Sequence, residues 1–252
     1  MLYITPLPQE KRIGWFLLIP AVVLPMLMVT ENMLLKGAYY LALGIATVYV
    51  FRSFLKESFH GLTGNWGSFI AKSLGILVVS QLAVILINNL FLMFQVGSFV
   101  SGPHGIYFQS NYDLYWLKVF PQSPIVVIAL MVLVIPVTQE ILLRGLFFNT
   151  FYQKHPWLAV LVTALVFALL HTLPYMGIYS AGQVLLLFLQ YLPAGFLLSI
   201  AYIVTESVYA PIALHVALKT YLFIFYLCFL TSPAGCVLTE GRFFHEFALY
   251  HP

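Results

Sequence analysis

The chain has 252 residues, of which 62% are hydrophobic and only 8% are charged, and its formal net charge is +3. Soluble domains carry about 25% charged residues, so this composition excludes an ordinary soluble protein. The basic residues are scattered, which argues against a nucleic-acid partner. Because long apolar runs must satisfy their backbone groups inside lipid, the sequence predicts an all-α polytopic membrane protein, with a single membrane domain over residues 1–252.

Seven apolar runs are long enough to span a bilayer, which requires about 17–25 residues. In chain order they lie at about 13–30, 37–54, 69–95, 124–150, 157–175, 182–204 and 208–231. The third run could instead contain a break near Asn88 and Asn89. We therefore expect a bundle of about seven to eight transmembrane helices.

The distribution of basic residues predicts the orientation of this multi-pass protein. With seven spans, one side of the bilayer receives Lys11, Arg12, Arg52, Lys56, Lys72 and Lys154, and the other receives Lys36, Lys118 and Arg242. The positive-inside rule then places the N-terminus in the cytoplasm, with an uncleaved first helix, and the tail from about Ser232 outside. The aromatic-rich polar segment 97–122 is expected to lie on the membrane surface.

The fourth run carries Glu140 and Arg144, one helical turn apart in the favourable acid-first order for an ion pair. Ionisable groups at bilayer depth are costly, so they usually face a bundle interior and serve a function. Pro136, just before them, can kink the helix. The alternative is a purely structural ion pair at the end of a span.

Two later runs carry His171 and His215, the second followed one turn later by Lys219. By themselves they fit hydrogen-bonded core histidines and a lysine that snorkels to water. However, Glu140, His171 and His215 lie within about two helical turns of one another in depth, so they can converge on one cavity. A carboxylate and two histidines could activate water and stabilise an oxyanion, bind a divalent metal such as zinc, or relay protons.

Three motifs in chain order resemble those of a known family. The family pattern is EExxxR, then FxxxH, then HxxxN on successive hydrophobic segments. This chain reads Gln139-Glu140-Ile-Leu-Leu-Arg144, Phe167-Ala-Leu-Leu-His171 and His215-Val-Ala-Leu-Lys219. Residues 124–222 thus resemble the motif-bearing core of the CPBP family, the CAAX-prenyl-protease and bacteriocin-processing (Abi) membrane proteins, which include the Ras-converting endopeptidases.

The resemblance implies a helical bundle with an intramembrane cavity, in which a peptide bond of a membrane-associated peptide or protein is hydrolysed. It assigns water activation to position 139, the first residue of the first motif, together with His171. Glu140 and Arg144 are then a supporting ion pair. It places His215 and Lys219 at the oxyanion. It leaves metal dependence open, with His171, His215 and Glu140 as the candidate ligands. We expect an integral protein of a bacterial plasma membrane.

Two positions depart from the family pattern: Gln139 replaces the first Glu, and Lys219 replaces the final Asn. An amide has no basic carboxylate and cannot take a proton from water. This chain is therefore expected to be inactive or an inactivated variant, by an engineered change or by natural loss, unless Glu140 acts as the base after a helix distortion at Pro136. Lys219, as a second departure, favours natural divergence.

The alternative function is a non-proteolytic scaffold or regulator that binds another membrane protein through the same cavity. A proton-coupled transporter is disfavoured because no inverted repeat is visible.

Overall fold

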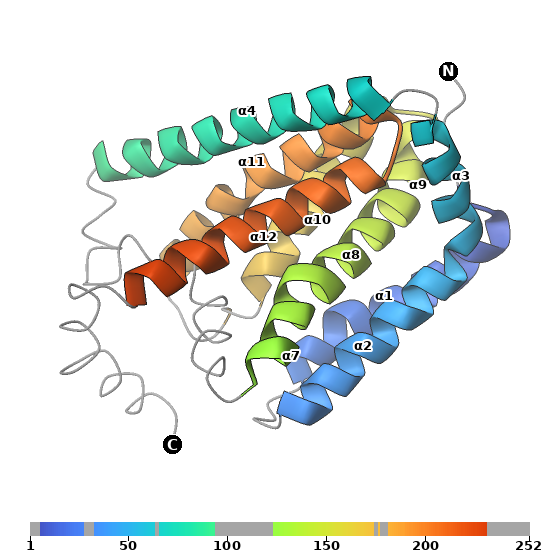
Figure 1. The fold of residues 1–252 in the computed structure, drawn as a ribbon, viewed down its shortest axis with the longest axis horizontal. Coiled ribbons are helices and arrows are strands. Elements are labelled where there is room, and N and C mark those ends of the chain that lie inside the picture. Colours follow the sequence, from blue (N-terminus) through green and yellow to red (C-terminus); the bar gives the residue numbers. More distant parts are fainter. Residues whose placement is uncertain are drawn as a thin grey trace. The chain divides into compact units, whose positions relative to one another are not determined.

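The computed structural model describes residues 6–27, 33–63, 66–93, 123–173, 176 and 181–230, and these residues form helices and no β-strand (Figure 1). The predicted all-α class is therefore confirmed. The chain divides into two units, Met1–Val216 and Ala217–Pro252, and the last helix crosses their boundary. The helices are α1 (Pro8–Leu27), α2 (Met33–Val50), α3 (Arg52–Thr63), α4 (Trp66–Met93), α10 (Pro156–Thr172), α11 (Ala181–Thr205) and α12 (Tyr209–Leu230), with one composite helix before α10.

Each of the seven predicted apolar runs contains a long helix. Helix α4 continues through Asn88 and Asn89, so the alternative of a break there is wrong. Within the described ranges, Pro124–Tyr152 and Leu187–Thr205 are long and apolar enough to cross a membrane, and the bent pair α2–α3 would make a third span. The segment 97–122 and the tail from Ser232 lie outside the described residues.

The composite helix runs from Pro124 to Tyr152 and changes its turn type along the way. Its parts are α7 (Pro124–Ile128), the π-helical η3 (Ala129–Val134), α8 (Ile135–Glu140), the π-helical η4 (Ile141–Phe148) and α9 (Asn149–Tyr152). Pro136 lies in the first turn of α8, directly after a π segment. Short π segments inside helices occur often at functional sites. Pro136 thus follows one π segment, and Glu140 is the last residue before the second.

Helix α2 ends where the sequence changes from apolar to amphipathic, and α3 leaves it at an angle of 64°. The predicted run had continued to residue 54. Helix α3 buries Phe54 and Ser58 and exposes Arg52, Lys56 and His60. The Glu10 carboxylate accepts hydrogen bonds from the backbone N–H groups of Ser53 (3.1 Å) and Phe54 (3.3 Å) at the start of α3.

The turn between α11 and α12 is fixed by serine hydroxyls. The Val208 N–H donates to Ser58 Oγ at 2.9 Å, and the hydroxyls of Ser58 and Ser207 lie 3.2 Å apart. Glu206 adopts φ 53°, the left-handed conformation that commonly ends a helix, here without a glycine. These bonds join α3 to the start of α12 and so position the turn that leads to His215.

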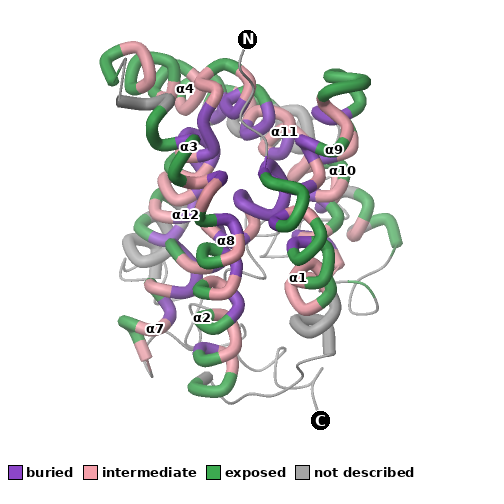
Figure 2. The backbone as a smooth tube through the Cα atoms, turned by 90° about the vertical axis from the view of Figure 1, so that its right-hand side faces the viewer, coloured by how far each residue is buried: buried purple, intermediate pink, exposed green. Residues whose placement is uncertain are grey.

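Close helix approaches bring the site-bearing helices together in the first unit. Helix α10 packs along α11, α11 also packs on α4, and α1 and α2 pack on the composite helix (Figures 1 and 2). A Cβ atom on Gly195 of α11 would lie 2.8 Å from the Cα of Ala164 on α10, so only glycine permits this approach. The α8 and η4 parts of the composite helix are largely buried (Figure 2).

The Glu10 carboxylate, which is 5% exposed, is expected to stabilise the protein as the cap of α3. Glu10→Ala should lower the free energy of unfolding by about 1–2 kcal/mol, because two N–H groups of the first turn lose their acceptor. Denaturant unfolding in one detergent measures this change. The exposed Glu57 is the matched control, and an equal loss in Glu57→Ala would contradict a capping role.

Candidate active site

The site centres on Glu140, whose side chain is completely buried between two partners. Its Oε1 lies 2.9 Å from Nδ1 of His215, and its Oε2 lies 3.1 Å from a terminal nitrogen of Arg144. Because a carboxylate oxygen accepts, Nδ1 of His215 donates. The predicted i,i+4 ion pair is present, and its carboxylate also holds the histidine of the third motif.

Arg144 extends this network to α11. A second guanidinium nitrogen donates to the carbonyl of Gly195 at 3.3 Å, and the guanidinium carbon lies 6.0 Å from the ring centre of Phe167. Both charged side chains are fully buried. Breaking a charge pair in an apolar interior is costly, and the bonds of Glu140 with His215 and of Arg144 with Gly195 join the composite helix to α12 and α11.

His171 is held by its own helix and by aromatic rings. Its Nδ1 lies 2.8 Å from the Phe167 carbonyl, and its ring centre lies 4.2 Å from that of Phe167 and 4.7 Å from that of Tyr191. Since a carbonyl only accepts, Nδ1 carries the hydrogen and the lone pair is on Nε2. The ring centre of His215 is 5.9 Å away. The structure thus brings Glu140, His171 and His215 together.

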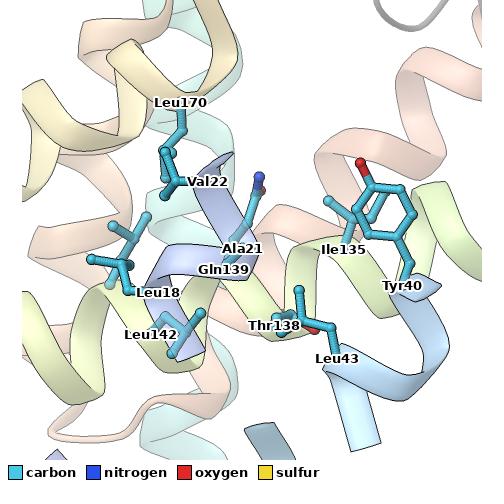
Figure 3. A pocket seen from close by; sticks show the side chains of 11 residues that line it. Leu18, Ala21, Val22, Tyr40, Leu43, Ile135, Thr138, Gln139, Leu142 and Leu170 are labelled. Carbon is cyan, nitrogen blue, oxygen red and sulfur yellow. The ribbon is translucent and has the colours of Figure 1, made fainter. Parts of the chain in front are cut away.

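Gln139 faces a different space from Glu140. It lines a cavity of about 40 Å³ between α1, α2, α10 and the composite helix (Figure 3). The residues that line this cavity are Leu18, Ala21, Val22, Tyr40, Leu43, Ile135, Thr138, Gln139, Leu142, Leu143 and Leu170. The Oε1 atom of Gln139 is buried and has no hydrogen-bond partner in the described part of the chain. The cavity is large enough for a water molecule, which needs about 10–15 Å³.

Leu170 of α10 lines the small cavity, whereas Glu140, His171 and His215 are not among its lining residues. Lys219 lies one helical turn beyond His215 on α12, in the second unit. The placement of Lys219 at an oxyanion and the roles of the other site residues remain predictions.

Helix α11 supplies two site residues that the sequence analysis missed. Tyr191 covers one face of His171, and Gly195 gives its carbonyl to Arg144. Their four-residue spacing on either side of Pro193 puts them one helical turn apart. Small residues inside apolar runs are typical of close helix packing in membranes. Gly195, one turn from Tyr191, was therefore the sequence feature that could have indicated this contact.

Metal binding finds no support in the geometry of the described residues. Among them, no group of three His, Cys, Asp or Glu side chains has the placement needed to hold a metal ion. Both oxygens of Glu140 already face His215 and Arg144. His171, His215 and Glu140 therefore do not fit a zinc site as arranged, and we derive no catalytic step through a metal.

The fold and this cluster define a helical membrane protein with a buried polar site. Residues 121–221 match the family model described as type II CAAX prenyl endopeptidase Rce1-like. The matched segment contains all three motifs, and the match confirms the resemblance to the CPBP family. No curated protein and no solved structure matches the chain.

A double-mutant cycle tests the coupling of Glu140 and Arg144. Arg144→Met alone should cost about 3–5 kcal/mol of unfolding free energy, because it leaves the Glu140 carboxylate buried without its cation. Adding Glu140→Gln should recover part of that loss. Thermal and denaturant unfolding of the purified chain measure both changes. Additive losses would show that the two side chains are energetically independent.

Zinc analysis tests the conclusion that His171, His215 and Glu140 do not form a zinc site. Full-length protein purified without chelator and dialysed against zinc should retain well below one equivalent, because the three candidate ligands are not arranged around one point. Elemental mass spectrometry gives the ratio, with His171→Ala as the control for specific retention. One equivalent that disappears in His171→Ala would overturn this expectation.

Proposed function

We propose that the chain is an intramembrane endopeptidase-like protein that retains the supporting frame of a peptide-bond hydrolase but has an amide at the base position. The observation that carries this proposal is the cluster of Glu140, Arg144, His171 and His215 within a segment that matches the Rce1-like family model. A frame of this kind, in a membrane bundle, fits hydrolysis of a peptide bond in a membrane-associated substrate.

The histidine tautomers support distinct roles in the proposed hydrolysis. With Nδ1 bonded to the Phe167 carbonyl, His171 presents a basic Nε2 that can take a proton from water as the water oxygen attacks the peptide carbonyl. The same proton can then pass to the leaving amine. His215 is oriented through Nδ1 by Glu140, and when protonated it can donate from Nε2 to the oxyanion. Lys219 is the proposed second donor.

Glu140 is poorly suited to replace the missing base. One carboxylate oxygen accepts from His215 and the other lies against Arg144. Taking a proton from water would require the carboxylate to give up one of these partners in a fully buried position. Of the three explanations for Gln139, the geometry therefore supports loss of the base, natural or engineered, over replacement by Glu140.

A second candidate function is a non-proteolytic scaffold or regulator. The unpartnered Oε1 of Gln139 favours it, because a buried carbonyl oxygen without a hydrogen bond costs about 1–3 kcal/mol and can be satisfied by a bound ligand or partner group. In this case the cavity of about 40 Å³ would take a polar group of another membrane protein, since it is too small for a whole segment.

The proposed setting is the bacterial plasma membrane. We propose seven spans, formed by α1, α2, α4, the composite helix, α10, α11 and α12. The N-terminus would be cytoplasmic, because Lys11, Arg12, Arg52, Lys56, Lys72 and Lys154 then lie on the cytoplasmic side.

Restoring a carboxylate at position 139 tests the proposal. Gln139→Glu should raise cleavage of a panel of membrane-tethered peptides by about 10²–10⁴-fold over the unmodified chain, the usual contribution of a positioned base. Adding His171→Ala should remove the gain. Mass spectrometry of the cleaved peptides gives the rate and the bond that is cut.

Gln190→Glu is the matched control, because Gln190 also has a buried, unpartnered Oε1 on a nearby helix. An equal gain in this variant would mean that position 139 has no special role. If neither Gln139→Glu nor the unmodified chain cleaves any peptide, while co-purification of a membrane protein depends on Gln139 and His171, the scaffold function replaces the enzyme.

A further inference from the structure

A second cavity lies along α2 and shares Thr138 with the cavity of Gln139. It is a groove of about 540 Å³ between α2 and the η3 and α8 parts of the composite helix. Its lining residues are Leu41, Gly44, Ile45, Val48, Tyr49, Arg52, Leu133, Val134, Val137 and Thr138. Nearly all of these are apolar, and Arg52 is the one charged residue.

The groove is open to the surroundings along a helical stripe. Leu41, Ile45, Val48 and Tyr49 are each more than two-fifths exposed. From Leu41 to Tyr49 the stripe covers about 12 Å at 1.5 Å per residue, which is most of one leaflet of a hydrocarbon core about 30 Å thick. At the bottom of the groove, a Cβ on Gly44 would lie 2.9 Å from Val134, so the two helices are in close contact there. The groove therefore has the length and surface of an acyl-chain site.

The end of the groove nearest α3 is basic. The Arg52 guanidinium lies 4.6 Å from the ring centre of Tyr49 and donates to the Tyr49 carbonyl at 3.3 Å. Lys56 follows one turn later on α3, and both cations are exposed.

Two acidic residues lie near this basic end. Glu57 is exposed beside Lys56, and Glu10 is buried with its carboxylate bonded to the start of α3. Neither carboxylate forms an ion pair with Arg52 among the described residues. The bend of 64° between α2 and α3 thus brings an apolar groove to an end at two cations.

We infer that this groove binds one anionic phospholipid, with an acyl chain between α2 and the composite helix and the phosphate at Arg52 and Lys56. An arginine offers several donors to phosphate oxygens, and an aromatic side chain beside it suits the level of the headgroups. A lipid without net charge could place its acyl chain in the groove but would gain little from the two cations. The inference does not depend on the proposed peptidase activity, because Arg52 is not part of the candidate active site.

Native mass spectrometry of the full chain in a neutral detergent, titrated with phosphatidylglycerol or phosphatidylcholine, tests this site. The unmodified chain should retain one phosphatidylglycerol in preference to phosphatidylcholine. Arg52→Gln should weaken retention of phosphatidylglycerol about fivefold, the effect of about 1 kcal/mol per basic residue near anionic lipid, and reduce the difference between the two lipids. Lys154→Gln, at an exposed position outside the groove, is the matched control and should change neither.

A second pair of variants tests the acyl-chain part. Ile45→Trp fills the groove and should weaken retention of both lipids, whereas Val78→Trp, at a similarly exposed position on α4, should not. The inference is overturned if Lys154→Gln acts like Arg52→Gln, or if Val78→Trp acts like Ile45→Trp. It is also overturned if phosphatidylcholine or a neutral prenyl alcohol binds as tightly as phosphatidylglycerol, or if glycerol phosphate alone competes as well as the lipid.

Discussion

The burial of the Glu140 carboxylate is the constraint on which the site depends. A fully buried carboxylate must be compensated, and here Arg144 and His215 provide the compensation from one turn along the same helix and from α12. Arg144 is in turn bonded to the Gly195 carbonyl of α11. Three helices are thereby joined through one negative charge, and the placement of His215 follows from satisfying that charge.

Gln139 and Glu140 are adjacent in the sequence but face different parts of the protein. Glu140 faces the histidine cluster, while Gln139 lines a small cavity bounded by α1, α2 and α10. The charge network would persist with either Gln or Glu at position 139, because position 139 does not take part in it. The proposed loss of activity therefore needs no loss of structure, and a scaffold could keep the frame of an enzyme.

The sequence predicted those features that follow from local periodicity and from the free-energy cost of placing charged groups in an apolar helix. Apolar runs predicted the long helices, and the four-residue spacing predicted the ion pair of Glu140 with Arg144. It did not predict the bend at Phe51, because the run was extended into residues whose amphipathic character begins there. Nor did it predict the hydrogen bond from His215 to Glu140 or the contributions of Tyr191 and Gly195, since these depend on how separate helices pack.

The same packing explains how the groove and the small cavity of Gln139 can adjoin without merging. Thr138 lines both, and its hydroxyl donates to the Val134 carbonyl at 2.7 Å, so its polar atom is satisfied within its own helix. Gly44 of α2 approaches Val134 and Thr138 closely on the groove side, while Leu43 faces the cavity of Gln139. One contact between α2 and the composite helix thus separates a surface suited to lipid from the space in front of Gln139.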